Sequence, residues 1–532
     1  MKYTTLAIGM LFCLCIQMNA QQKLSISKAQ LRDKIAGGWA GKMIGVTYGA
    51  PVEFRALGKT YEDSIYWTPK DIPGSLWQDD IYVQLTFMMT MDEYGINAPA
   101  VKFQEMFAKA GYMLWHANVQ ARKNYYDNIY PPASGNPQYN THADDIDFQI
   151  EADYLGFMCP GMPNTAMRMA DKIGHIMNYG DGVYGGVFLA ALNSHAFFEN
   201  DIPTLINKAL QSIPAKSDYA KIVQDVIALH KKYPNNWRSA WKPLQAKWGY
   251  DHFCEAGSDF NIDAKLNGAY IVMGLLYGDG DINKTLEIST RCGQDADCNP
   301  SSAMAVLGVI KGYQQLPENI KAGIEATGDS LFIKTNYSFN KAVDRTYYYA
   351  TEMIKQHGGK IIGDQFIIQK ENPLPAKFEV AFPNMILDKK VSIFDNNNWQ
   401  FNGNWATHTL GMQNNEPNKQ AKFSATKGDA ITIDFDGTGI SINGNWVKDG
   451  GKADVYIDGK FSRTINTYFY YNNQEHTNIS LWHVIGLKPG KHQVKLVVKG
   501  EKQFDSKGSN VYITGVSVYK MGKKMSSVYK ID

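Results

Sequence analysis

The stretch 290–303, TRCGQDADCNPSSA, has residue types that can bind a metal ion or form a disulfide. Asp295 and Asp297 lie two residues apart, and on an irregular loop both carboxylates can point at one ion. Carboxylate oxygens suit Mg²⁺, Mn²⁺ or Ca²⁺. The flanking Cys292 and Cys298 leave a disulfide open, because such a bridge would stiffen this loop in an oxidising compartment. The sequence contains no CxxC pair, which argues against a structural zinc site.

A second acidic stretch, GSLWQDDIYVQLTF at 74–87, places Asp79 and Asp80 side by side after Gln78. The apolar residues that follow recur at helical spacing, so both acids are expected in the first turn of a helix. Carboxylates at this position interact favourably with the helix dipole. Two adjacent carboxylates can also face a shared cation, and both interpretations stay open for this stretch alone.

A third stretch, GKMIGVTYGAPVEF at 41–54, combines close packing with an acid. Gly41, Gly45 and Gly49 recur every four residues and therefore let another backbone approach one face of a helix. Glu53 follows directly after this helix and Pro51. Taken alone, the stretch predicts tight helix packing and a surface glutamate.

The three stretches together are more specific. Along the chain they read GxxxGxxxGxPxE, then DD at a helix start, then GxDxDxxP at a late helix start. In this order and separation they resemble the ADP-ribosylglycohydrolase family, which includes dinitrogenase reductase-activating glycohydrolases and ADP-ribosyl-acceptor hydrolases. The resemblance covers about residues 27–315. It implies an all-α fold with a central cleft that holds divalent cations, usually a pair of Mg²⁺ ions, with Mn²⁺ or Ca²⁺ as alternatives.

The resemblance also implies roles for individual residues. The cation ligands that it implies are Gln78, Asp79, Asp80, Asp295 and Asp297. The catalytic residues that it implies are Glu53, Asp79 and Asp297. Two positions depart from the family pattern, because Gln78 and Cys298 replace hydroxyl residues of the family's ligand clusters. These departures leave the number and spacing of the ions open, and they keep a binding protein with a degenerate metal site as an alternative.

Further acids lie between the motifs, in THADDIDFQIEADYLG at 141–156. Apolar residues alternate with these acids, so some of the carboxylates are expected to turn inward rather than form a solvated face. The stretch HIMNYGDGVYGG at 175–186 resembles the family's central loop before a helix, and His175 is a further candidate there. The predicted substrate-binding residues are Asp147, Glu151, Asp153, Asn178, Tyr179 and Asp181. Hydrogen bonds from sugar hydroxyls to these groups would favour a substrate other than the family's usual one.

The first residues predict export. Lys2 precedes an apolar run from Leu6 to Ile16, and the sequence MNA before Gln21 suits cleavage of a signal peptide over residues 1–20. The run is too short for a spanning helix, and no later segment is long and apolar enough. The chain carries a net charge of +2 without a basic run, so nucleic acid is not an expected partner.

The remaining pattern predicts two domains. Residues 21–360 show helical spacing and form the expected all-α domain, and residues 361–390 are expected to be a linker. Residues 391–532 alternate short β-rich runs with turns, among them the hairpin signal Asp458-Gly459. They predict an all-β, jelly-roll-like sandwich that can serve as a carbohydrate-binding module. Aromatic residues for a sugar platform would be Trp399, Trp405, Trp446, Trp482 and the run TYFYYNN at 467–473, although core packing explains such residues equally well.

These features predict a secreted or periplasmic, metal-dependent glycoside hydrolase. It would cleave the anomeric bond of a ribosyl or related furanosyl substrate, either a small molecule or a glycan. An exported hydrolase of protein-bound ADP-ribose is an alternative, and a non-catalytic sugar-binding protein is another. The sequence makes no prediction of the oligomeric state.

Overall fold

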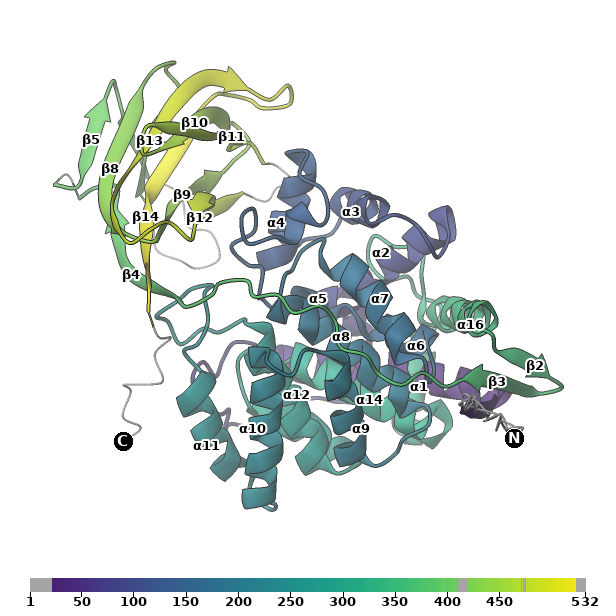
Figure 1. Ribbon diagram of the computed structural model, residues 1–532. Coiled ribbons are helices and arrows are strands. Elements are labelled where there is room, and N and C mark those ends of the chain that lie inside the picture. The colour runs from purple at the N-terminus through teal and green to yellow at the C-terminus, as the bar shows by residue number, and fades with distance from the viewer. Residues whose placement is uncertain (1–21, 396, 410–419, 470, 472–474, 523–532) are drawn as a thin grey trace, which may run out of the picture.

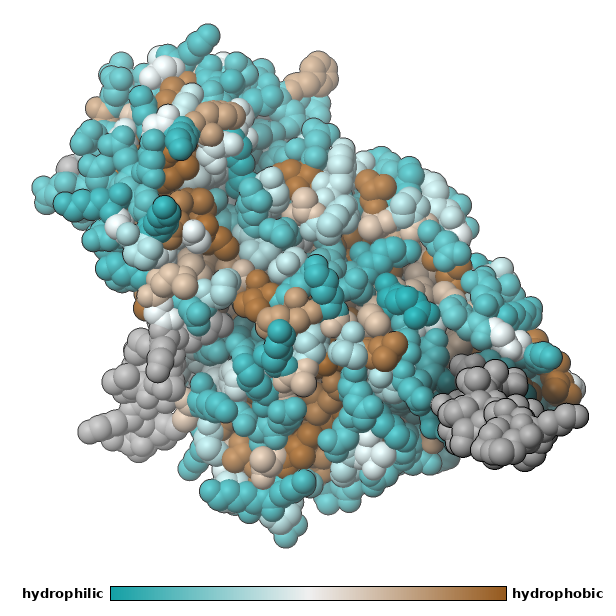
Figure 2. Space-filling view, viewed as in Figure 1, coloured by the Kyte–Doolittle hydropathy of each residue, from teal (hydrophilic) through white to brown (hydrophobic). Residues whose placement is uncertain are grey.

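The structure is a computed structural model, which describes residues 22–395, 397–409, 420–469, 471 and 475–522. The predicted signal peptide, residues 1–20, lies outside the described residues. A helical domain and a smaller β domain lie beside each other, and a long extended segment runs along the helical domain to connect them (Figure 1). Hydrophilic side chains cover most of the face shown in Figure 2, over both domains. Within the described ranges, none of the helices combines the length and the apolarity that crossing a membrane requires.

The helical domain consists of helices packed around one apolar core. Its helices are α1 (Lys28–Gly49), α2 (Asp79–Tyr94), α3 (Ala100–Lys109), α4 (His116–Tyr126), α5 (Asp147–Ile150), α6 (Asp153–Met158), α7 (Pro163–Gly174), α8 (Asp181–Ala196), α9 (Ile202–Ala209), α10 (Asp218–Lys232), α11 (Trp237–Trp248), α12 (Ala264–Gly278), α13 (Ile282–Arg291), α14 (Cys298–Lys311), α15 (Glu318–Glu325) and α16 (Phe339–Gln356). Ser27 caps α1 through a capping box with Gln30.

The glycine repeat of α1 allows backbone contact with α14. A Cβ atom at Gly41 would lie 2.0 Å from the carbonyl oxygen of Met304, and one at Gly49 would lie 1.9 Å from that of Ala296. As the residue numbers rise along α1 they fall along α14, so the two helices run antiparallel. This packing brings the end of α1, and Glu53 after it, to the loop that carries Asp295 and Asp297.

The β domain is a sandwich of two antiparallel sheets. Its strands are β4 (Met385–Ser392), β5 (Trp399–Asn402), β6 (Ala406–Thr409), β7 (Gln420–Ser424), β8 (Ala430–Gly437), β9 (Gly439–Trp446), β10 (Gly451–Ile457), β11 (Lys460–Asn466), β12 (His476–Val484), β13 (Gly490–Lys502) and β14 (Val511–Met521). One sheet has the order β11-β10-β13-β8-β5, the other has the order β12-β9-β14-β7-β6, and β4 pairs with β14. The predicted hairpin joins β10 to β11, where Asp458 and Gly459 both have positive φ. The predicted fold class, a helical domain followed by a β-sandwich, is confirmed.

The segment predicted as a linker, residues 361–390, is partly regular. Strand β1 (Lys23–Ser27) pairs with β3 (Gln365–Gln369), and β3 pairs with β2 (Lys360–Ile362). Phe366 and Ile368 of β3 are buried, so this small sheet packs its apolar face on the helical domain. Strands this short give too few alternating positions to be predicted from the sequence. Strand β4 then begins at Met385, inside the predicted linker.

Residues 370–384, here called the connecting segment, are held against the helical domain by a partly buried ion pair. His175 Nε2 lies 2.9 Å from Glu379 Oε2. Burial alone lowers the pKa of His175, but the hydrogen bond to Glu379 and the charge of Asp171 produce a net rise. The pair therefore contributes stability below the ordinary histidine pKa and loses it as the pH rises through the raised value.

Replacing Glu379 by glutamine is expected to reduce the free energy of unfolding by roughly 2 kcal/mol at pH 6, because a charged hydrogen bond is lost. At pH 9 the loss should be smaller, since His175 is then neutral in both proteins. Urea unfolding at the two pH values measures the difference. The variant E352Q, which breaks the half-exposed ion pair of Glu352 with Lys355 and involves no histidine, is the control. An equal loss at both pH values for E379Q would contradict the His175 ion pair.

The domains also meet through stacked aromatic rings. Phe382 of the connecting segment stacks on Phe253 of the helical domain, with ring centroids 3.8 Å apart. On the β domain, Tyr519 of β14 stacks on the same Phe253 at 4.7 Å. Aromatic pairs at these distances bury large apolar areas. This three-ring stack is one point that fixes the sandwich against the helices.

Candidate metal centre and active site

Acidic side chains from three separate segments meet at one place in the helical domain. Ligand atoms of Asp80, Asp297 and Cys298 lie within 4.8 Å of one another, and so do those of Glu53, Asp295 and Asp297. Asp297 belongs to both groups. The shared residue makes the cluster, here called the carboxylate cluster, suitable for two neighbouring cations with one bridging carboxylate.

The carboxylates of this cluster are available to a ligand. Asp80, Asp295 and Asp297 are at most 4% exposed, and one oxygen atom of each lacks a hydrogen-bond partner among the described residues. Asp297 occupies the N-cap position of α14, but its side chain forms no capping hydrogen bond in the described structure. Helix capping therefore does not explain Asp297. An unpaired buried carboxylate oxygen is costly unless a cation or a donor meets it.

The charges of the cluster repel one another. Partial burial of the Glu53 carboxyl group, followed by the charges of Asp297 and Asp79, raises the pKa of Glu53 to about 9. The Glu53 side chain still contacts solvent. Burial raises the pKa of Asp295 to about 8, and it also raises that of Asp79 to about 7 with help from Asp80. A divalent cation would offset this negative charge. An oxygen-rich donor set of this kind fits a hard cation such as Mg²⁺.

Two further predicted ligands, Gln78 and Asp79, directly precede Asp80 in the chain. Asp79 is half-buried in the first turn of α2 and is not a member of either group, although its charge acts on Glu53. Gln78 is half-buried at the N-cap of α2. Both adjoin Asp80 at the start of α2, and their ligation remains a prediction.

The cysteines of this region are thiols. Cys298 Sγ donates a hydrogen bond to Asp80 Oδ2 at 3.0 Å, and burial followed by the charge of Asp295 raises the pKa of Cys298 well above its ordinary value. The sequence left a disulfide between Cys292 and Cys298 open, and the described structure has both as free cysteines. Cys298 thus supplies a donor at a position where the family has a hydroxyl, and it orients Asp80.

Lys42 is a functional neighbour that the sequence did not reveal. It is fully buried on α1, and its ammonium group lies 2.7 Å from Asp153 Oδ2 and 3.9 Å from Asp80 Oδ1. It also donates to the carbonyl oxygen of Ile150 at 3.0 Å. Its position within the glycine repeat suggested only helix packing. The ammonium group instead holds α1, α2 and the start of α6 together beneath the carboxylate cluster.

Replacing Lys42 by methionine is expected to destabilise the chain by about 3–5 kcal/mol, because it leaves the buried carboxylate of Asp153 without its cation. Urea unfolding measures this loss. The double variant K42M/D153L should recover a large part of it, because the buried carboxylate of Asp153 is then removed together with its cation. A loss below about 1 kcal/mol for K42M would contradict the ion pair, since that is an ordinary effect for a point mutation.

The acidic stretch 141–156 turns inward more completely than expected. Asp153 is fully buried, and its carboxylate accepts hydrogen bonds from Lys42 and Asn193. The structure therefore gives Asp153 a structural role in place of the predicted contact with substrate. Asp147 accepts hydrogen bonds from the first backbone N–H groups of α4, at Ala117 and Asn118. It therefore fixes the start of α4 through favourable helix-terminus contacts.

Glu151 is also fully buried, and Asn118 donates to its Oε1 at 2.5 Å. Its other oxygen finds no hydrogen-bond partner among the described residues. Burial, followed by the charges of Asp147 and Asp79, raises the pKa of Glu151 well above its ordinary value. Glu151 therefore lies within electrostatic reach of the carboxylate cluster, and its contact with substrate stays a prediction.

The predicted substrate residues of 175–186 lie elsewhere. Asn178 is fully buried, and its amide bonds the backbone at Ala143, Asp145 and Phe148, so it clamps a loop and does not face a substrate. Asp181 begins α8 and accepts from the backbone N–H of Tyr219 at 3.2 Å. The half-buried Tyr179 lines a pocket between the domains.

Aromatic rings form a wall beside Glu53. Phe54 follows Glu53 with a left-handed φ of 53°, and its ring lies 5.1 Å from that of Phe260. Phe260 in turn stacks on His116 at 5.7 Å. A non-glycine residue with positive φ is strained and is often found at a functional site. The strained turn at Phe54 fixes the backbone next to the Glu53 carboxyl group.

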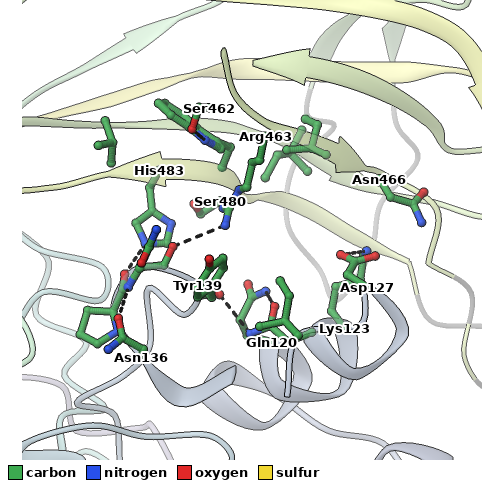
Figure 3. A pocket seen from close by; sticks show the side chains of 18 of the residues that line it. Gln120, Lys123, Asp127, Asn136, Tyr139, Ser462, Arg463, Asn466, Ser480 and His483 are labelled. Carbon is green, nitrogen blue, oxygen red and sulfur yellow. Dashed lines mark hydrogen bonds and ion pairs between the residues drawn. The ribbon is translucent and has the colours of Figure 1, made fainter. Parts of the chain in front are cut away.

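A polar groove of about 960 Å³ lies between the domains (Figure 3). The helical domain contributes Lys123, Asp127 and Tyr139, and β11 of the sandwich contributes Arg463 and Asn466. The guanidinium of Arg463 lies 5.2 Å from the centroid of the Tyr139 ring. Hydroxyl, amide and charged groups together with an aromatic ring are the side chains that a carbohydrate requires.

The predicted aromatic platform on the sandwich is largely core. Trp399, Trp446 and Trp482 are at most 6% exposed. Trp405 is half-buried, and the run at 467–473 falls partly outside the described residues. Core packing, the alternative interpretation, therefore accounts for Trp399, whereas Trp446 and Trp482 are buried and also line the groove between the domains.

Comparison with known proteins identifies one family. A model of the ADP-ribosylglycohydrolase family matches residues 27–345, well over half of the chain. A search of curated proteins found no match. Among solved structures, an ADP-ribosylglycohydrolase-related protein complex is similar at 14% identity over 61% of this chain and 99% of that chain, with a TM-score of 0.43.

Other similar structures contain carbohydrate-active proteins. A two-domain esterase active on acetylated mannans has 14% identity over 35% of this chain and 47% of its own, with a TM-score of 0.22. A carbohydrate-binding module in complex with calcium and xylotriose has 14% identity over 25% of this chain and 99% of its own, with a TM-score of 0.16.

Proposed function

We propose that this chain, which belongs to the ADP-ribosylglycohydrolase family, hydrolyses the anomeric bond of a ribosyl or related furanosyl substrate. Members of this family typically depend on divalent metal ions and hydrolyse glycosidic-type bonds. The observation that carries this proposal is the carboxylate cluster, in which Asp297 is shared by two ligand groups and Glu53 belongs to one of them. Mg²⁺ is the proposed cation, and the two groups suit a pair of ions.

The residues of the cluster divide into two roles. Asp80, Asp295 and Asp297 are buried and would hold the cations. A bound divalent cation supplies positive charge to oxygen atoms of the sugar and of the attacking water. Glu53 is the exposed acid of the cluster, so its carboxyl group is the one that can exchange a proton with water or with the leaving oxygen. Lys42 and Cys298 keep Asp80 in place.

The predicted signal peptide supports action outside the cytoplasm, in the periplasm or the medium. Ribosides, free ADP-ribose-like compounds and furanosyl glycans are the substrates that we propose for this location. The polar groove between the domains supports a glycan, because side chains of both domains reach into it. An exported hydrolase of protein-bound ADP-ribose is the alternative substrate assignment. Gln78 and Cys298, which replace hydroxyl residues, are the feature that favours a non-catalytic sugar-binding protein.

Product analysis separates these possibilities. The full mature chain with Mg²⁺ is incubated with ADP-ribosylated protein, with a set of ribosides and with furanosyl glycans, and the released sugars are identified. Release from ribosides or glycans supports the proposal. Release from the modified protein alone supports the alternative hydrolase, and binding of a sugar without any release supports the non-catalytic protein.

A further inference from the structure

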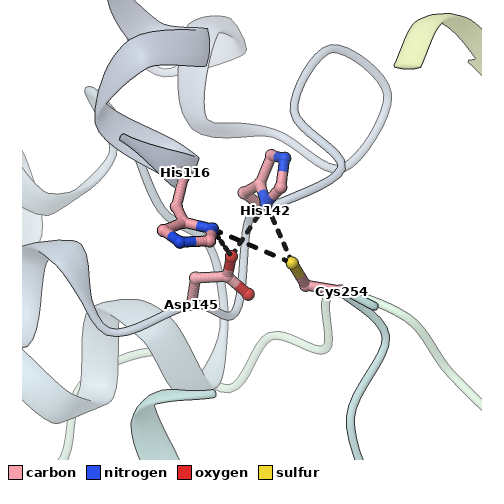
Figure 4. A group of neighbouring side chains, drawn as sticks. All are labelled: His116, His142, Asp145 and Cys254. Carbon is pink, nitrogen blue, oxygen red and sulfur yellow. Dashed lines mark hydrogen bonds and ion pairs between the residues drawn. The ribbon is translucent and has the colours of Figure 1, made fainter. Parts of the chain in front are cut away.

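A second group of side chains meets near the start of α4, apart from the carboxylate cluster. Figure 4 shows His116, His142, Asp145 and Cys254 pointing toward one another from three different segments. One ligand atom from each of the four lies within 4.8 Å of the others. His142 Nδ1 is 3.2 Å from Cys254 Sγ and 2.8 Å from Asp145 Oδ2. His116 Nδ1 is 4.0 Å from the sulfur and 3.6 Å from the same Oδ2.

The arrangement differs from a nucleophilic triad. In a triad one ring nitrogen faces the nucleophile and the other faces the carboxylate. Here the same atom, Nδ1 of His142, faces both Cys254 and Asp145. One imidazole nitrogen cannot donate a proton to Asp145 and accept one from the Cys254 thiol at the same time. Four possible ligand atoms instead gather within 4.8 Å of one another, which is close enough for one metal ion to contact all of them.

The donor set and its spacing fit a tetrahedral zinc ion. Two imidazole nitrogens, one thiolate sulfur and one carboxylate oxygen are ordinary Zn²⁺ ligands. Bond lengths of about 2.0–2.3 Å in a tetrahedron place the donors about 3.3–3.6 Å apart. The four separations given above, between 2.8 and 4.0 Å, lie on both sides of this range. A hard cation such as Mg²⁺ would not select sulfur and two imidazoles.

The backbone holds these donors in place. His116 has a left-handed φ of 42°, and Glu255, directly after Cys254, has a φ of 51°. Strain at non-glycine residues persists where the surrounding structure or a ligand requires it. Asp145 is fully buried, and its Oδ1 has no hydrogen-bond partner among the described residues. Its backbone pairs with that of Asp263 in an isolated β-bridge, which fixes the loop.

The site is accessible and distinct. His142 and Cys254 line a pocket of about 430 Å³ whose opposite wall belongs to the sandwich, so a metal ion has a route of entry. One apolar cluster, with Ile146 and Ile262, includes both Cys254 of this site and Cys298 of the carboxylate cluster, so apolar residues connect the two polar sites.

We propose that His116, His142, Asp145 and Cys254 form a Zn²⁺ site. The ion fixes the loop that carries Cys254 against the start of α4, whose first N–H groups bond Asp147. A single cysteine suffices for this site, so the absence of a CxxC pair did not exclude zinc. The proposal is independent of the glycosidic activity.

Metal analysis and cobalt substitution test the site. The full mature chain, dialysed against Zn²⁺ and then against metal-free buffer, should retain one zinc ion. Co²⁺ added to the metal-stripped chain should give the visible bands of a tetrahedral complex and a near-ultraviolet thiolate-to-metal charge-transfer band. C254S should lose the charge-transfer band, and H142A should lose most of the zinc.

Matched controls locate the metal. C298S changes the thiol of the carboxylate cluster and D297N changes its shared carboxylate, and both should keep the zinc and the cobalt spectrum. A wild-type chain that takes up neither ion, or that gives no charge-transfer band, would overturn the proposal without any variant. Loss of the zinc in D297N together with its retention in C254S would overturn it as well.

Discussion

The variant E53Q is expected to lose about 10²–10⁴-fold in turnover, because glutamine cannot transfer a proton in the transition state. Glu53 is the exposed acid of the carboxylate cluster, and its pKa is raised to about 9 by the packed chain around it and by neighbouring carboxylates. The substitution keeps the size of the side chain, so binding of cations by the buried aspartates should persist. Rates of sugar release with saturating Mg²⁺ measure the loss.

The surface variant E93Q is the control for this substitution. Glu93 is exposed and lies at the end of α2, whereas Asp80 of the cluster lies at its start. It should retain wild-type rates. Circular dichroism and thermal unfolding should be unchanged in both variants. Full activity of E53Q would rule out its assigned role in proton transfer.

The variant D297N is expected to separate function from stability. Asp297 belongs to both ligand groups, so its loss should remove cation binding and reduce turnover by about 10³-fold or more, as expected when several kcal/mol of electrostatic stabilisation are lost. In the metal-free chain the same change removes one of several repelling carboxylates. The metal-free variant should therefore unfold at the same temperature as the wild type or at a higher one.

Thermal unfolding with and without Mg²⁺ measures both effects. A cation at one hundred times its dissociation constant should stabilise the wild type by about 2.7 kcal/mol. It should leave D297N unchanged, while the surface variant D63N should respond like the wild type. An equal stabilisation of D297N by Mg²⁺ would contradict the placement of the cations.

The sign of the pH effect follows from the same repulsion. In the folded, metal-free chain the pKa of Asp79 is raised to about 7 and that of Asp295 to about 8. At pH values between the ordinary aspartate pKa and these raised values, the folded chain therefore binds more protons than the unfolded chain. Its stability therefore falls as the pH rises through this window. Bound Mg²⁺ should oppose the fall, and its stabilising effect should be largest at the alkaline end.

The sequence predicted the parts of the site that depend on local pattern. The glycines at 41, 45 and 49 predicted close approach of another backbone, and α14 makes that approach. The pair Asp79-Asp80 predicted a helix start, which α2 provides. Helix spacing and turn residues likewise predicted the two domains, because these signals act over a few residues.

The parts that depend on tertiary contacts could not be predicted. Lys42 reads as one polar residue in a packed helix, and only the fold brings it to Asp153. The alternation of acidic and apolar residues in 141–156 predicted inward carboxylates without showing which would be fully buried. His116, His142 and Cys254 are separated by up to 138 positions, and no spacing rule connects them.

The most direct test of the central claim is the rate of sugar release by the metal-stripped chain as Mg²⁺ is added back. If the carboxylate cluster is the active site of a glycosidic hydrolase that depends on a divalent cation, the metal-stripped wild type should release sugar only at the background rate. Added Mg²⁺ should restore its rate in a saturable way, and it should not restore the rate of D297N. An undiminished rate in the metal-stripped wild type, or a full recovery in D297N, would contradict it.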